Sequence, residues 1–420
     1  MELRLLSCVG VVAFVALAWA ISLNRKAFPW RTVTWGIGLQ FVLGLLILKT
    51  SWGAALFRLT GSAIQQLIRF SNEGCKFVFG PLADDAAMAA AFPRNPMIFA
   101  VLVTGTIIIV SALSSLFYHW GLLQRVVHGI AWVMRRVLRT SGSETLSAAA
   151  NIFMGQTEAP LLVKPYLPRM TRSELLCVMV GGMATIAGGV GAVYAKLGAD
   201  AGHANMAGHL LTASVLNAPA ALLIAKVLLP ETEESETRSG VLKDPPRATV
   251  NSVDALCRGT GDGMTLAINV LAMLIGFVAV VALANYLLSV PQTLVGISDP
   301  VTLQKFFGWI NAPFAWLMGV PAKDCVAVGQ ILGERIVLNE FIGYLSLTNP
   351  QTVLEPRSFD ITTYALCGFA NFSSIAIQVG GIGSLAPERR PDMARLGVRA
   401  MVGGVLATYL TASIAGILMG

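Results

Sequence analysis

Long apolar runs separated by short polar segments dominate the chain. A run of about 20 apolar residues is long enough to cross the hydrocarbon core of a bilayer as an α-helix. The runs are too continuous for the alternating pattern of a membrane β-barrel strand. The sequence therefore predicts an all-α polytopic membrane protein with eight transmembrane helices, near residues 5–23, 32–50, 96–118, 174–195, 207–229, 265–289, 360–382 and 397–418.

Two further segments, residues 144–170 and 324–348, are too polar for ordinary spans and too apolar for loops. Each is followed by a span that small or polar residues interrupt, and then by a plain span. The order of hairpin, broken helix and plain helix therefore occurs twice, which predicts a repeat of two re-entrant helical hairpins. Each segment has an Asn and a Glu deep inside it, Asn151 and Glu158 in the first and Asn339 and Glu340 in the second.

The composition fits this class, with 55% hydrophobic and only 13% charged residues, against about 25% charged in an average soluble domain. Basic residues fall in alternate loops, which the positive-inside rule makes cytoplasmic. Both termini then lie on the outer side, and the hairpins enter from opposite sides, so the repeat is inverted. The basic residues form no single exposed face, and the net charge of +7 does not indicate nucleic-acid binding. They are Arg125, Arg135, Arg136, Arg139, Lys164, Arg169, Arg172, Lys226, Arg238, Lys243, Arg247, Arg258, Arg389, Arg390, Arg395 and Arg399.

Residues 1–22 have the length of a secretory signal peptide. Only Arg4 precedes the apolar run, however, and the other nearby basic residues follow it, so we interpret the segment as a retained first span. The longest polar stretch, residues 231–252, mixes charges of both signs and contains proline. It is typical of a mobile cytoplasmic connection rather than a domain.

An inverted repeat with interrupted helices is typical of secondary transporters, which bind substrate and ions near the bilayer midplane. A carboxylate at that depth costs about 2.5–3.5 kcal/mol on insertion scales, so such groups usually line a cavity. The chain would form a hairpin tip after Gly155, from which the side chains of Gln156, Thr157 and Glu158 point into one cavity. The alternative is that they cap the backbone ends of their own hairpin.

Glu340 occupies the corresponding place in the second hairpin, and its alternative role is a buried ion pair with Arg335 or Lys323. In GFANFSSIA, Asn371 places an amide inside an apolar helix, where it needs a partner from another helix. The neighbouring Phe369 either packs or stacks on a ligand.

An all-oxygen cation site is also indicated near the Gly-flanked sequence MATIAGG. Hard cations bind oxygen, and an uncharged ligand set favours a monovalent ion. The candidate ligands are the side chain of Asn151, the carbonyls of Met154 and Ile186, and the hydroxyl of Thr185. The six cysteines and four histidines are dispersed and show no metal-binding spacing.

GQTEAP, LNEF and FANFSSIAI, in this order between these spans, resemble a bacterial member of the concentrative nucleoside transporter family. NEGCKFVFG at 72–80 and GSLAPERR at 383–390 extend the resemblance over nearly the whole chain. The resemblance implies a homotrimer in which an inner transport domain moves like an elevator against an outer scaffold. We also expect interfacial helices, next to scaffold helices 1–3. The expected parts are scaffold helices 1–3 (1–118), a first transport repeat (119–230), a cytoplasmic connection (231–264), scaffold helix 6 with an outer linker (265–312), and a second transport repeat (313–420).

The resemblance also implies roles for individual residues. Gln156, Thr157 and Glu158 would read the nucleobase, with Val190 beside the base, whereas Glu340, Asn371 and Ser374 would hold the ribose against Phe369. The family's sodium site maps to Asn151, Met154, Thr185 and Ile186. Thr185 stands where some members carry Ser, which keeps the oxygen but leaves the coupling ion open, and some bacterial relatives use protons.

The expected function is sodium-coupled uptake of nucleosides such as uridine across the bacterial inner membrane. Proton coupling, or transport of another polar solute such as a nucleobase, are the alternatives within this architecture. An intramembrane enzyme that uses Glu158 and Glu340 as acid and base is a further alternative. The sequence disfavours it because no nucleophile dyad or metal-ligand cluster accompanies the two carboxylates.

Overall fold

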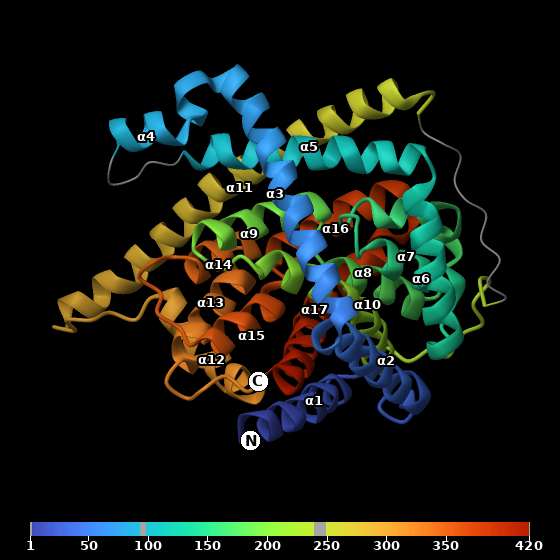
Figure 1. Cartoon of the computed structure of the whole chain (residues 1–420). Coiled ribbons are helices and arrows are strands. Elements are labelled where there is room, and N and C mark those ends of the chain that lie inside the picture. Colours follow the sequence, from blue (N-terminus) through green and yellow to red (C-terminus); the bar gives the residue numbers. More distant parts are fainter. Residues whose placement is uncertain (1, 93–97, 239–248, 420) are drawn as a thin grey trace.

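The computed structural model describes residues 2–92, 98–238 and 249–419, and every regular element in these ranges is a helix (Figure 1). The all-α fold predicted from the apolar runs is confirmed. Three short helices, labelled η, are of the 3₁₀ type. The N-terminal part contains α1 (Glu2–Ala20), α2 (Trp30–Lys49), α3 (Ser51–Phe79), η1 (Gly80–Ala83), α4 (Asp85–Ala91) and α5 (Phe99–His119).

The first repeat begins with an amphipathic helix, continues through a hairpin and a broken helix, and ends with a long helix. Capping boxes at Ser141 and Thr171, each closed by a glutamate three residues later, start the hairpin and the broken helix. The elements are α6 (Leu122–Leu138), α7 (Gly142–Ala150), η2 (Ala159–Arg169), α8 (Arg172–Ala184), α9 (Gly188–Asp200) and α10 (Met206–Leu228).

After the long helix α11 (Ser252–Leu294), the second repeat follows the same order. Its predicted start at residue 313 falls inside α12, because Thr302 already caps that helix. Close approach between α12 and the hairpin depends on glycine: a Cβ atom at Gly329 would lie 2.4 Å from the Gly308 carbonyl oxygen. The elements are α12 (Leu303–Leu317), α13 (Cys325–Val337), α14 (Glu340–Leu347), α15 (Pro356–Leu366), α16 (Phe372–Leu385), η3 (Pro387–Arg389) and α17 (Arg390–Leu418).

Five of the eight predicted spans correspond to helices in the described residues that are long and apolar enough to cross a bilayer. The other three differ for identifiable reasons. Helix α5 turns by 77° into α6 at Gly121, which has a positive φ of 71°, and residues 96 and 97 of that prediction lie outside the described residues. The span at 265–289 is part of the 43-residue α11. The span at 360–382 breaks between α15 and α16, so neither half is long enough alone.

Burial separates an inner group of helices from an outer one. Within their apolar windows, α10 and α17 are buried at 89% and 83% of positions, whereas α1 and α2 are buried at 33% and 22%. In Figure 1, α8, α10 and α17 lie in the middle of the molecule, and α3, α5 and α11 pass along its outside. The apolar composition of both groups is similar, so this difference arises from packing.

Helix α6 buries one stripe of its surface and exposes the opposite face, as expected of an interfacial helix. Val127, Ala131, Met134 and Leu138 are buried, while Trp132 is exposed. The predicted connection at 231–264 is only partly described, because Lys243, Arg247 and the rest of residues 239–248 lie outside the described residues. Its beginning, residues 231–238, folds back against the base of the first hairpin.

Candidate substrate and cation site

The tip of the first hairpin is a non-helical turn between α7 and η2. Helix α7 ends at Ala150 with Asn151 as its C-cap, and Gly155 and Pro160 keep the following segment from continuing as an α-helix. The Gly188 amide donates a hydrogen bond to the Phe153 carbonyl at 3.2 Å. This bond joins the tip to the point where α8 and α9 are interrupted.

The interruption itself consists of Thr185, Ile186 and Ala187. Thr185 and Ala187 have extended backbone, with φ/ψ of −125°/165° and −65°/142°. Glycines on both sides allow the chain to pass close to the hairpin, since a Cβ atom at Gly181 would lie 3.3 Å from Asn151 Nδ2. The break leaves peptide groups of this segment outside the helical hydrogen-bond ladder.

The second hairpin places a carboxylate in the protein interior. Asn339 caps α14 by accepting a hydrogen bond from the Ile342 amide at 3.0 Å, so Glu340 becomes the first helical residue. Glu340 is only 6% exposed. Its Oε1 accepts from the Tyr194 hydroxyl of α9 at 3.0 Å, and its Oε2 accepts from Asn371 Nδ2 at 3.1 Å.

Asn371 also starts α16 after the second break. Its Oδ1 accepts hydrogen bonds from the Ser374 amide at 2.9 Å and from the Ser373 hydroxyl at 2.7 Å. The amide therefore acts as helix cap and as donor to Glu340 at once. This double use explains why an Asn stands in the middle of an otherwise apolar segment.

Gln156 connects the first hairpin to the same cluster. Its Nε2 donates to the Ser374 hydroxyl at 3.2 Å, and the side chain is 8% exposed. Thr157 lies against Gly381 of α16, where a Cβ atom would be 2.8 Å from its Cγ2. The two hairpins and both helix breaks thus meet around the N-terminus of α16.

Glu158 does not join this cluster. Its side chain is exposed, and its Oε2 accepts a hydrogen bond from the Gly155 amide at 3.3 Å within the same hairpin tip. This hydrogen bond is one that the capping alternative predicts, whereas Gln156 reaches across to α16. Val190 is buried on α9, four residues before Tyr194, and Phe369 is half-buried beside the second break.

The ion-pair alternative for Glu340 is not realised among the described residues. Lys323 pairs instead with Glu355, at 2.6 Å between Nζ and Oε1, on the surface. Arg335 is fully buried but bonds to the Ala365 carbonyl and the Thr408 hydroxyl.

Two residues of the cluster were missed by the sequence reasoning. Gln378 is fully buried and its Nε2 donates to Gln156 Oε1 at 3.1 Å and to the Met179 carbonyl at 3.0 Å. It follows Asn371 and Ser374 at helical spacing, so the polar positions of this apolar helix form one stripe. That periodicity could have identified Gln378, whereas Tyr194 reads as an ordinary aromatic residue of a buried helix.

The residues proposed for a cation fit an oxygen-ligated ion. Asn151 is completely buried, and its Oδ1 has no hydrogen-bond partner among the described residues, although its Nδ2 donates to the Ser147 carbonyl at 3.0 Å. The Thr185 hydroxyl donates to the Gly181 carbonyl at 2.9 Å, which leaves its lone pairs available. No group of three or more His, Cys, Asp or Glu side chains in the described ranges could hold a metal.

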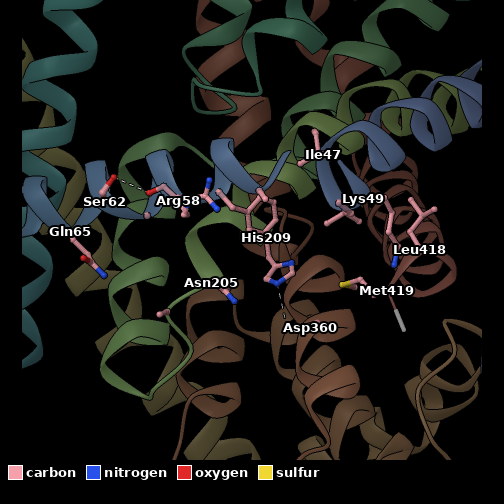
Figure 2. Close-up of a pocket in the computed structure, with 15 residues that line it drawn as sticks. Ile47, Lys49, Arg58, Ser62, Gln65, Asn205, His209, Asp360, Leu418 and Met419 are labelled. Atoms are coloured by element: carbon pink, nitrogen blue, oxygen red, sulfur yellow. Dashed lines mark hydrogen bonds and ion pairs between the residues drawn. The ribbon is translucent and has the colours of Figure 1, made fainter. Parts of the chain in front are cut away.

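A cavity of about 660 Å³ is lined by none of these residues (Figure 2). It is bordered by α2 and α3 on one side and by α10, α15 and the end of α17 on the other, with Arg58, His209 and Asp360 in its wall. A second cavity of about 260 Å³ touches Ile186 and the hairpin residues Ile152 and Phe153. Residues of both α3 and α10 line each of the two cavities.

Models of three protein families match the chain. "Na+ dependent nucleoside transporter N-terminus" covers residues 9–82, "Nucleoside recognition" covers 100–201, and "Na+ dependent nucleoside transporter C-terminus" covers 209–416. Together they include both hairpins and both helix breaks.

Relatives align over the whole chain. An uncharacterized transporter of Haemophilus influenzae is 42% identical over 422 residues, which is 99% of this chain and 97% of the relative. Sodium/nucleoside cotransporter 1 of Rattus norvegicus is 40% identical over 431 residues, covering 99% of this chain and 64% of the relative.

The structure of the chain is also similar to solved structures. CNTnw in an inward-facing substrate-bound state has a TM-score of 0.91 at 38% identity and covers 100% of this chain and 98% of that one. A variant of CNTnw in an outward-facing state has a TM-score of 0.93 at 37% identity, covering 100% and 99%.

Proposed function

Because the chain belongs to the concentrative, sodium-dependent nucleoside transporter family, we propose that it performs cation-coupled secondary active uptake of nucleosides such as uridine. The family consists of transporters, which decides against the intramembrane enzyme. The observation that carries the proposal is the buried polar cluster that links Gln156, Ser374, Asn371, Glu340 and Tyr194 across four elements.

The chemistry of this cluster suits a nucleoside. A ribose presents hydroxyl donors, and the Glu340 carboxylate is a strong acceptor for them. The Gln156 amide both donates and accepts, as recognition of a nucleobase edge requires. In this proposal Thr157, Glu158 and Val190 complete the base side, and Phe369 forms the apolar wall of the sugar side. Micromolar affinity needs about 8 kcal/mol, which a few such bonds with apolar burial can supply.

Sodium is the proposed coupling ion, held by Asn151, Met154, Thr185 and Ile186. Support comes from the buried, unpartnered Oδ1 of Asn151 beside the break that carries Thr185. When bound, the ion couples substrate binding to the membrane potential. One charge moving through 100 mV contributes about 2.3 kcal/mol, and at about 1.4 kcal/mol per decade this corresponds to roughly fifty-fold accumulation. Proton coupling is the competing assignment.

We further propose that the two hairpin repeats form a transport domain that moves, elevator-fashion, against a scaffold within a homotrimer in a bacterial inner membrane. The contact between α3 and α10 supports relative movement. A Cβ atom at Gly208 would meet Phe57 at 2.2 Å, and residues of both helices line both cavities. Cavities next to this contact leave room for one helix to move relative to the other.

The test is uptake of radiolabelled uridine into proteoliposomes with an inside-negative potential. Uptake is expected to saturate and to require sodium. Glu340→Gln and Glu158→Gln should each reduce it sharply, while Glu236→Gln, which alters an exposed carboxylate paired with Arg169, should not. Normal uptake in both site variants would overturn the site. Uptake driven by a proton gradient without sodium would overturn only the ion assignment.

A further inference from the structure

Arg335 is a fully buried charged residue for which the proposed function has no use. It lies on α13, the arm of the second hairpin that leads to Glu340. Its Nη1 donates to Thr408 Oγ1 of α17 at 3.0 Å and to the Ala365 carbonyl at the end of α15, and the Tyr409 ring centroid lies 5.6 Å from its Cζ.

The guanidinium has no carboxylate partner. Its Nε and Nη2 make no hydrogen bond, and no Asp or Glu side chain among the described residues lies within 4.0 Å of it. A buried charge without a counter-charge is strongly unfavourable. The carbonyl end of α15 and the Tyr409 ring offset part of this cost, since both present negative partial charge.

The remaining counter-charge is Glu340. It lies five residues further along the same hairpin and is itself buried, so both charges share one low-dielectric interior. The hydrogen-bond donors to Glu340, Tyr194 and Asn371, are both neutral. The other titratable groups that face this pair are Tyr344 of α14, Tyr409 of α17 and Cys367 after α15. None of them can supply positive charge.

We propose that Arg335 is a positioning residue for nucleoside binding, whose charge maintains Glu340 as an anionic acceptor for the ribose hydroxyls. The inference rests on the proposed function, because it presumes that Glu340 meets the ribose. The same guanidinium also ties the hairpin arm to the break between α15 and α16, where Asn371 begins the other half of the ribose site. The Arg335 side chain therefore both supplies the positive charge for Glu340 and holds the hairpin arm next to the break that carries Asn371.

A merely structural brace would act differently. It would support the hairpin equally for every nucleoside, and its loss would weaken binding of nucleosides with and without hydroxyl groups on the sugar. A residue that acts through Glu340 affects only ligands whose hydroxyls use that carboxylate. The comparison of uridine with 2′,3′-dideoxyuridine separates the two roles.

The experiment measures binding of both nucleosides to purified protein in sodium by calorimetry. Arg335→Gln should weaken uridine binding by about 10- to 100-fold, the range for a hydrogen bond to a charged group, and weaken dideoxyuridine binding by less than about threefold. Arg335→Lys should bind uridine closer to wild type. Thr408→Val, which removes one of the two hydrogen bonds of the guanidinium but keeps its charge, should retain the preference for uridine. In the double variant with Glu340→Gln, no further loss beyond Glu340→Gln alone is expected.

Three results would overturn the inference: equal loss for both nucleosides, additive losses in the double variant, or unchanged uridine binding in Arg335→Gln while Glu340→Gln is impaired. If Arg335→Gln fails to fold, Arg335→Lys and Thr408→Val still decide. A brace predicts that each variant weakens binding of both nucleosides by similar factors, whereas a role through the charge predicts that each keeps the preference for uridine. Unchanged uridine binding in Glu340→Gln would instead remove the proposed ribose site, and the role of Arg335 with it.

Discussion

The two hairpins share a topology, but only the second buries charged side chains toward its tip. At the base of the first hairpin, Lys226 Nζ lies 2.8 Å from Glu144 Oε2, 3.1 Å from Glu231 Oε2 and 3.0 Å from the Ser173 hydroxyl. Beside it, Glu174 accepts hydrogen bonds from Ser235 at 2.5 Å and from the Thr171 amide at 2.9 Å. The tip of this hairpin contributes uncharged oxygens and amides to the interior.

The second hairpin is arranged differently. Its base is held by Asp324, whose Oδ2 accepts from the Ser358 hydroxyl at 2.5 Å, and by the exposed pair of Lys323 and Glu355. Two further buried charges, Arg335 and Glu340, lie toward the tip, in addition to Asp324 at the base. The first hairpin is therefore fixed at its base by a buried ion pair and turns uncharged side chains inward at its tip, with Glu158 exposed, whereas the second hairpin buries a carboxylate at its tip.

This difference shows how an inverted repeat can serve two ligands. A neutral, oxygen-lined tip suits a cation, and a buried carboxylate suits a neutral solute rich in hydroxyl groups. The two hairpins have the same backbone topology, and their tips meet. Their side chains differ, so one tip suits a cation and the other suits a neutral solute. The following predictions test that division.

The largest effect is expected at the base of the first hairpin. Lys226→Met leaves Glu144, which is 1% exposed, as a buried carboxylate without its cation. Loss of one partner of a buried pair costs about 3–5 kcal/mol, and the midpoint of thermal unfolding in detergent should fall strongly. Lys323→Gln, at the corresponding base of the second hairpin, should leave the midpoint unchanged because that pair is exposed. If the unfolding midpoint fell by similar amounts in both variants, the bases of the two hairpins would not differ in the proposed way.

A smaller effect is expected at the tip of the first hairpin. Asn151→Ala removes the buried oxygen proposed to bind sodium. The half-saturating sodium concentration for uridine uptake should rise about tenfold, equivalent to about 1.4 kcal/mol. Asn339→Ser at the second tip keeps a helix-capping oxygen and should leave sodium dependence as in wild type. A shift of equal size in Asn339→Ser would argue against a cation at the first tip alone.

The smallest effect concerns the fit of the first tip against α8. A Cβ atom at Gly182 would lie 2.8 Å from Gln378 Nε2, 2.9 Å from Gln156 Cβ and 3.2 Å from Gln156 Cα. Gly182→Ala should therefore displace the Gln156 amide and weaken uridine binding about fivefold, which corresponds to the lower end of the roughly 1–3 kcal/mol range of overpacking. Gly189→Ala, whose nearest neighbour would be at 3.8 Å, is the matched control. Equal affinities in the two variants would show that Gln156 tolerates displacement.

Several features could be predicted because their causes are local. Apolar runs of spanning length required helices in a membrane, and the Asn residues at 339 and 371 marked positions where helices begin. Lys226 illustrates the opposite case. It was counted among cytoplasmic loop cations, yet it is buried within α10, because its partner Glu144 comes from the first hairpin, far away in the chain, while Glu231 follows only five residues later.

The glutamates show the same limit within one site. Glu158 and Glu340 look equivalent in the two repeats, but one is exposed at its hairpin tip and the other is buried against Tyr194 and Asn371. Burial depends on neighbours contributed by other helices, and residue type alone does not reveal it. Gln378 was missed for the same reason, since its role arises from contact with Gln156 more than 200 residues away in the chain.

By itself the sequence determined the class of protein, the repeat and the kinds of polar group available to the site, because hydropathy, helix caps and residue chemistry act over a few neighbouring residues. Only the tertiary structure decided which of those groups are buried together and which charges face one another. Burial and charge pairing are set by contacts between distant segments, and those contacts exist only after the helices have packed.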